Sequence, residues 1–195
     1  SGASGGAAMA GGKLWPVTKN WLAFEAKGVL YWVAQVWPEL HVLRTTATPG
    51  PWTVAPAHVS RTSAVLRSVM GLTASCEVHG GANPLFVSTS PSGREYHLGI
   101  VHVVAPDAPR LDYANHAVAF APTPPFAIMG VSQRLPLVAT PTSRPCPRPV
   151  AFASGLAMTS NGSTTELRIS YGVCDSEARL VMVTLGEMEG RMVWF

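Results

Sequence analysis

Apolar and polar positions alternate along short stretches of this chain, and turn-forming residues separate the stretches. The clearest case is an apolar run at 150–158, the dipeptide Asn161-Gly162, and an alternating run that ends near 171. Asn-Gly supplies the positive φ angles of a tight hairpin turn, so the two runs are predicted to pair as antiparallel strands. A third strand is expected at 180–185, where apolar residues on both faces are typical of a central strand. The segment therefore predicts a three-stranded meander.

The same alternation recurs upstream, where Gly, Pro, Asn and Ser mark the ends of the runs. These residues predict turns at 27–28, 90–93 and 122–125. The expected strands cover 21–25, 29–36, 41–45, a fourth strand that starts at Trp52, and then 85–88, 95–104, 113–120 and 126–131.

Residues 57–77 have a different character. Val59, Leu66 and Met70 recur at roughly helical spacing, and Ser60 and Thr62 are suitable helix caps. A short helix and an ordered loop fit this spacing equally well. A further pair of strands is the alternative, because the end of the segment could itself be extended.

Three units of short antiparallel strands are expected, at 20–56, 79–139 and 150–195, which predicts an all-β fold. Five prolines within 135–149 forbid ordinary strand pairing and indicate a connection between units. Residues 1–12 consist of Gly, Ala and Ser with one Met. Such a composition buries too little apolar surface to offset chain entropy, so a disordered tail or linker is expected.

Composition supports strands over long helices and narrows the classes of partner. The 195 residues are 47% hydrophobic and 13% charged, with 17 prolines and 18 glycines. The net charge of +3 is scattered, so nucleic acid is not expected as a partner. No apolar run reaches the roughly 18 residues of a membrane span, and no signal peptide is recognisable. We expect a soluble protein, and because it begins with Ser1, a processed chain or a fragment.

Cysteine and histidine positions do not indicate a metal site. Cys76, Cys146 and Cys174 lack metal-ligand spacing and allow at most one disulfide. His97 and His102, the closest histidine pair, are expected on opposite faces of one strand because their separation is odd. No metal and no cofactor are therefore expected.

The sequence leaves the cellular compartment open. Asn161-Gly162-Ser163 matches the N-glycosylation acceptor pattern, which favours the secretory pathway or an extracellular location. A hairpin turn explains the same Asn-Gly pair without any glycan.

The segments 152–156 (FASGL) and 169–175 (ISYGVCD) resemble the last blade of the five-bladed β-propeller glycosidases, most closely the family-130 mannoside phosphorylases and hydrolases. In that family the pattern runs F-P-T-G-L, turn, Y-Y-G-A-A-D. Residues 19–28 are similar to its K-D-W-x-x-F segment, and 79–104 resemble G-G-G-P-P-P-I, turn, G-W-L-L-I-Y-H-G-V. The resemblance implies a partial five-bladed propeller of about three four-stranded antiparallel blades.

The resemblance also implies a sugar-binding site. Asp175 falls on the aspartate at the sugar-binding end of the propeller, and His102 falls on the histidine at the phosphate or acceptor side of the pocket. An aspartate that merely caps a turn, and a core histidine bonded to a backbone carbonyl, are the alternatives. The remaining residues expected around the pocket are Gly80 and Gly81 where the backbone approaches the ligand, His79 and Asn20 as polar contacts, and Tyr171 or Trp21 to stack on a pyranose face.

The chain departs from the family where catalysis is concerned. Glu77, or Val78 with a one-residue shift, stands where the phosphorylases have a phosphate-gripping lysine, and a carboxylate repels phosphate. Phosphorolysis is thus disfavoured. The proton-donating aspartate of the family belongs to an N-terminal blade that nothing in this chain matches, so the catalytic acid is expected upstream.

Two functions remain. In the first, the chain is the C-terminal part of a carbohydrate-active propeller enzyme, a glycoside hydrolase or a glycosyltransferase-like protein. Such an enzyme binds a mannoside-type glycan, and the remaining blades lie upstream. In the alternative, the propeller is a non-catalytic glycan-binding or interaction module that kept the fold and lost the acid.

Overall fold

The described part of the chain confirms the predicted all-β class: it consists of antiparallel β-strands with two short helices, and none of its sheets closes on itself. The computed structural model describes residues 9–10, 13–14, 20–46, 53–88, 90–105, 113–141, 146, 149–162 and 164–195. β1 (Met9–Ala10) pairs with β2 (Lys13–Leu14), so the predicted tail at 1–12 contains a strand. The rest of that tail lies outside the described residues. Neither helix in the described ranges is long and apolar enough to cross a membrane.

The first sheet is a four-stranded meander, as predicted for the first unit. Its strands, in spatial order, are β3 (Leu22–Ala26), β4 (Val29–Gln35), β5 (Glu39–Thr46) and β6 (Thr53–Arg61). Lys27 and Gly28 have φ angles of 52° and 76°, the left-handed geometry that joins two strands tightly. Pro56 is tolerated in β6 because an edge strand needs partners on one side only.

Helix α1 (Ala64–Met70) confirms the helical alternative, but it begins later than predicted. Ser63 is the N-cap, since its side chain accepts a 3.1 Å hydrogen bond from the Leu66 N–H. Neither predicted cap has this role, because Ser60 lies in β6 and Thr62 lies between β6 and Ser63. The helix ends at Gly71, whose left-handed backbone accommodates the reversal.

The second sheet has six strands where four were predicted. They are β7 (Glu77–Gly80), β8 (Leu85–Val87), β9 (Tyr96–Val104), β10 (Tyr113–Phe120), β11 (Ile128–Ser132) and β15 (Met192–Trp194). The short β7 and β8 pair one after the other along the same side of β9. The C-terminal β15 pairs with β11, so the predicted unit at 150–195 contributes to two sheets.

The third sheet has three strands, which confirms the predicted meander, although the resemblance to propeller blades implied four. They are β12 (Ala151–Asn161), β13 (Thr164–Val173) and β14 (Glu177–Thr184), in that order. The predicted hairpin is confirmed, although Asn161 pairs with Thr164 and remains in β12. The turn is therefore centred one residue later than Asn-Gly, with Gly162 at a φ of 61°.

β14 lies at the edge of its sheet, so the prediction of a central strand apolar on both faces is wrong. Leu180 and Met182 are 59% and 58% exposed on one face. Val181 and Val183 pack against the core on the other face. The chain then turns into α2 (Leu185–Gly190), a helix that was not predicted.

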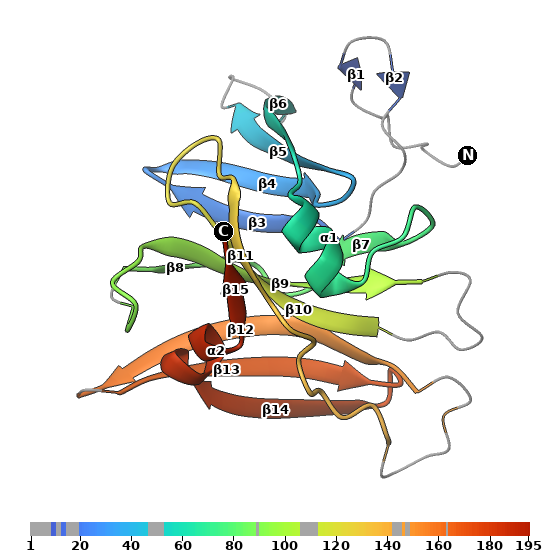
Figure 1. Cartoon of the computed structure of the whole chain (residues 1–195), viewed down its shortest axis with the longest axis vertical. Helices are drawn as coiled ribbons and strands as arrows, with labels where there is room; N and C mark the ends of the chain where they lie inside the picture. The colour runs from blue at the N-terminus through green and yellow to red at the C-terminus, as the bar shows by residue number, and fades with distance from the viewer. Residues whose placement is uncertain are drawn as a thin grey trace.

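Figure 1 shows the three sheets as successive layers with the second sheet in the middle. Alternate residues of β9 face opposite sides, as the strand geometry requires. Val101 and Val103 belong to the cluster shared with the first sheet, whereas Leu98 and Ile100 belong to the cluster shared with the third sheet. β9 is thus buried on both faces and lies at the centre of the molecule.

The described part of the proline-rich connection between the second and third sheets contains no strand, as predicted. A disulfide joins Cys146 of this connection to Cys174 in the turn after β13, within the predicted limit of one bridge. Arg179 on β14 also donates hydrogen bonds to the carbonyl oxygens of Val138 and Thr140, at 3.2 and 2.8 Å. The disulfide and these two hydrogen bonds therefore hold the connection against the third sheet.

Candidate functional site

His102 and Asp175 come to one side of the stacked sheets. His102 lies near the end of β9 and Asp175 lies in the turn after β13, and these two strands end on the same side in Figure 1. Phe152 links the two positions, because its ring is 5.1 Å from the His102 ring and its backbone pairs with Gly172 of β13. The structure thus places the predicted pair on neighbouring sheets and at matching ends.

Aromatic rings surround His102, which is 1% exposed. The ring centroids of His79, Tyr113 and Phe152 lie 5.5, 4.7 and 5.1 Å from that of His102. We call these four residues the His102 cluster. His79 Nε2 lies 2.9 Å from the carboxylate of Glu77, whose side chain is 65% exposed. The cluster therefore combines apolar ring surface with an imidazole, and the exposed carboxylate of Glu77 lies beside it.

The turn that carries Asp175 is held by its neighbours. Cys174 and Asp175 both have left-handed backbone, with φ angles of 54° and 52°. The Cys174 N–H donates a 3.1 Å hydrogen bond to the carbonyl of Val150, and the Ser176 N–H donates to Val173. Among the described residues, the exposed carboxylate of Asp175 caps no backbone N–H. Asp175 thus presents a charged acceptor from a fixed turn.

Gly80 and Gly81 bring strands together in this structure. A Cβ on Gly80 would collide with the carbonyl oxygen of Asn20 and would lie 2.8 Å from the side chain of Leu22. A Cβ on Gly81 would lie 2.7 Å from the carbonyl oxygen of Ala153. Backbone of the first and third sheets therefore lies against these two glycines. The position expected for a ligand is filled by the protein itself. Asn20 is exposed beside this contact.

Two asparagines that sequence reasoning missed join the layers on this side. Asn115 is buried, and its amide donates a 2.7 Å hydrogen bond to the carbonyl of Ala151 and accepts one from the Ala153 N–H. Asn83 accepts a 2.9 Å hydrogen bond from the Ala23 N–H. The sequence did contain a signal for Asn115, which is a single asparagine within an apolar strand. Buried amides are almost always hydrogen-bonded, so an asparagine at such a position indicates a polar contact.

Neither candidate for stacking on a sugar ring belongs to the His102 cluster. Tyr171 is 7% exposed and packs in the core between the second and third sheets. It also interacts with Arg179, whose pKa is raised first by hydrogen bonding to Glu177 and further by Tyr171. Trp21 is half-buried and packs edge-to-face against Trp32 of the first sheet, at 6.3 Å. The ring of Tyr171 is thus covered, and that of Trp21 is engaged by another indole.

The other buried histidines have structural partners. His97 packs 4.9 Å from the ring of Phe24, on the side of β9 opposite to the His102 cluster, and burial lowers its pKa. His116 donates from Nδ1 to the carbonyl of Ser132 at 2.9 Å, and burial lowers its pKa as well. Among the described residues, no three His, Cys, Asp or Glu side chains are grouped closely enough to hold a metal ion.

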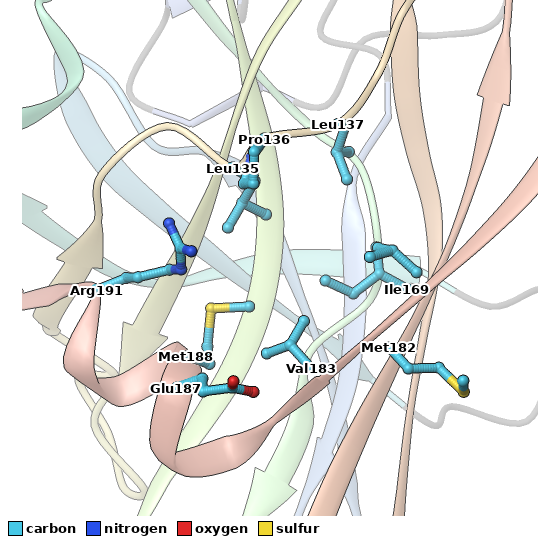
Figure 2. A pocket seen from close by; sticks show the side chains of 10 residues that line it. Leu135, Pro136, Leu137, Ile169, Met182, Val183, Glu187, Met188 and Arg191 are labelled. Atoms are coloured by element: carbon cyan, nitrogen blue, oxygen red, sulfur yellow. The ribbon is translucent and has the colours of Figure 1, made fainter.

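A cavity of about 220 Å³ lies away from the predicted site residues, between α2, β14 and the proline-rich connection. Figure 2 shows Leu135, Val183 and Met188 on its walls, with Glu187 and Arg191 as its charged groups. None of the residues predicted to bind a sugar lines it. Its apolar walls suit core packing better than a ligand rich in hydroxyl groups.

Comparison of the chain with protein-family models, with curated proteins and with solved structures found no match. The likeness to the mannoside-active propellers stays a prediction from the sequence patterns.

Proposed function

We propose that this chain is part of a β-propeller that binds a carbohydrate on the side formed by Asp175 and the His102 cluster. The observation that carries the proposal is that an exposed carboxylate and an aromatic, imidazole-containing cluster lie at matching ends of β13 and β9. Sugar sites combine acceptors for hydroxyl groups with apolar surface for the ring face, and both are present here.

The packing of the first strand of each sheet supports the propeller arrangement. Gly80 at the end of β7 contacts Asn20 just before β3, and Gly81 contacts Ala153 of β12. The first strands of three successive antiparallel sheets therefore lie beside one another, as the innermost strands of propeller blades do.

The proposal assigns binding roles to these residues. Asp175 accepts hydrogen bonds from two sugar hydroxyls, His79 and Glu77 bind a third, and the half-buried rings of Tyr113 and Phe152 face the apolar side of the pyranose. The ligand is a mannoside-type glycan of a hydrolase or a glycosyltransferase-like enzyme, whose proton donor comes from another part of the propeller. The exposed Glu77 carboxylate disfavours a phosphate co-substrate.

Titration calorimetry with manno-oligosaccharides tests the proposal. We expect the wild type to bind and Asp175→Asn to bind at least about tenfold more weakly, since a hydrogen bond to a charged group contributes roughly 1.5–3 kcal/mol. The matched control is Glu95→Gln, an exposed carboxylate just before β9 and thus at its other end. Equal affinity of wild type and Asp175→Asn, or no binding by the wild type, would remove the site.

A further inference from the structure

β14 presents a free strand edge. It pairs with β13 through eight consecutive residue pairs, from Glu177 to Thr184, without a register shift. Among the described residues, no strand pairs with its other side. Alternate N–H and C=O groups of this side therefore point away from the sheet, and such groups accept a further strand readily.

The other sheet edges carry features that discourage pairing, and β14 carries none of them. β6 contains Pro56 and has a register shift in its pairing with β5. β12 has a register shift in its pairing with β13, and the edge strands β3, β7, β8 and β15 have only three to five residues each. In β14 there is no proline and no lysine, and the charged Glu177 and Arg179 pair with each other at 2.7 Å on the inner face. β14 is thus a long, regular edge without a proline, a lysine or a bulge, and its charged residues are confined to one end of the strand, where they pair with each other.

The outer face of β14 is apolar at its centre and polar around it. Leu180 and Met182 are the most exposed large hydrophobic side chains of the described chain, at 59% and 58%. Their neighbours on β13 are Ser170 and Arg168, and Arg168 forms a 2.9 Å ion pair with Glu166. An apolar centre with a polar rim is the usual pattern of a protein–protein interface.

We propose that β14 pairs antiparallel with β14 of a second copy of this chain, around a twofold axis at Val181. In this register Leu180 lies opposite Met182 of the partner subunit, and Met182 lies opposite the partner's Leu180. Arg179 faces Val183 of the partner subunit, so no like charges oppose each other. The product is one continuous sheet with three strands from each copy.

The strand itself argues for a second copy over an unrelated peptide. A twofold contact places the same surface against itself, and a strand fits this requirement only if its exposed residues match in reverse order. Leu180-Val181-Met182 is apolar in either direction, and it places four large side chains together at the axis. Main-chain hydrogen bonds along the edge supply the affinity, and the side chains fix the register. This assembly does not depend on glycan binding.

Sedimentation velocity at increasing protein concentration tests the dimer. We expect the wild type to dimerise, and Leu180→Lys/Met182→Lys to raise the dimer Kd by about tenfold or more, because two pairs of lysines then oppose each other. Leu180→Lys/Met182→Glu has equally polar side chains but places each lysine opposite a glutamate of the other copy. We expect it to dimerise more tightly than the double lysine variant.

Val59→Lys is the matched control, because Val59 is 54% exposed on the edge strand β6. We expect it to dimerise as the wild type does, with all variants showing similar unfolding temperatures. Hydrogen exchange of the β14 amides should slow as the wild type dimerises. A monomeric wild type, equal dimerisation of the two double variants, or loss of the dimer in Val59→Lys would overturn the proposal.

Discussion

The hydroxyl of Tyr96 on β9 donates a 2.8 Å hydrogen bond to the carboxylate of Glu189 in α2, across 93 positions of the chain. The N–H and the hydroxyl of Ser92 donate to the same carboxylate, at 3.0 and 2.9 Å. Burial, together with the bond to Glu189, raises the pKa of Tyr96. The short C-terminal helix is therefore attached to the middle sheet by a buried polar network.

This network predicts that Glu189→Gln destabilises the protein. The amide places an N–H₂ group against donors and leaves at least one buried donor unpaired, which costs about 1–3 kcal/mol. Urea unfolding measures the free energy of unfolding, and Tyr96→Phe should cost less because it removes a single bond. Glu166→Gln, in a half-exposed ion pair, is the control and should change the value by less than about 1 kcal/mol. Equal stability of Glu189→Gln and wild type would contradict the prediction.

Gly80→Ala should separate the first and second sheets. Its Cβ meets the backbone of Asn20, which cannot move aside as a flexible side chain could, so we expect a loss of about 1–3 kcal/mol. Gly190→Ala is the control, because nothing lies within 4 Å of its Cβ position. Thermal unfolding of both variants checks the contrast. A Gly80→Ala variant as stable as Gly190→Ala would show that the two sheets can move apart without cost.

Removal of the disulfide should lower stability without unfolding the third sheet. Cys146 and Cys174 are 28 positions apart, and bridges that close loops of this size contribute about 2–4 kcal/mol. We expect Cys146→Ser to lose this amount in urea unfolding. A reducing agent should bring the wild type to the same value and leave the variant unchanged. A wild type unaffected by reduction would show that the bridge contributes nothing.

The stability of the protein should fall in mild acid. Burial holds the pKa of His116 below its ordinary value of 6.5, and the charge of Arg134 lowers it further. Below pH 6.5 the side chain of His116 therefore binds a proton in the unfolded chain but not in the folded chain. The free energy of unfolding consequently decreases as the pH falls below 6.5. Burial also lowers the pKa of His97, so His97 lowers the free energy of unfolding in acid in the same way.

Urea unfolding between pH 7.5 and 5.5 measures this slope, which should be smaller in His116→Gln than in the wild type. His58, a half-exposed histidine on β6, is the position for the matched control. An identical slope in wild type and His116→Gln would assign the acid sensitivity to other groups.

Local sequence signals predicted the strands and turns well, because such signals act between near neighbours. The strand expected at 113–120 is β10, and the expected turn at 90–93 is closed by a 2.9 Å hydrogen bond from the Gly93 N–H to the Ser90 carbonyl. β11 begins two residues later than predicted. Phe126 follows two prolines and has a φ of 58°, which no strand residue adopts.

Partners far apart in the sequence could not be predicted in this way. β14 is an edge strand because no fourth strand lies beside it among the described residues, and the apolar run at 180–185 looks the same in an edge and in a central strand. The pairing of Cys146 with Cys174 could not be derived from the spacing of three cysteines. For α2, a readable signal existed: Thr184 and Glu187 form a capping box, but the helix is too short to show periodicity.

For the candidate site, too, the sequence indicated local features but not the contacts between distant segments. Asp175 and His102 could be chosen from sequence patterns because each stands near the end of an apolar strand. The rings around His102 could not, since Tyr113 and Phe152 come from strands of two different sheets. The sequence also did not show that Gly80 packs against a neighbouring backbone. A glycine allows the close approach of a ligand and of a backbone equally well.

The pairing of β15 with β11 has a consequence for synthesis on the ribosome. The ring of Trp194 lies against Gly130, where a Cβ atom would be 2.7 Å from the ring. The guanidinium of Arg94 lies over the same Trp194 ring, 4.8 Å from its centroid. Residues 192–194 leave the exit tunnel long after β11, so the nascent chain exposes the β11 edge while the third sheet is still being made. Of these two sheets, the middle one therefore begins to form first and is completed second.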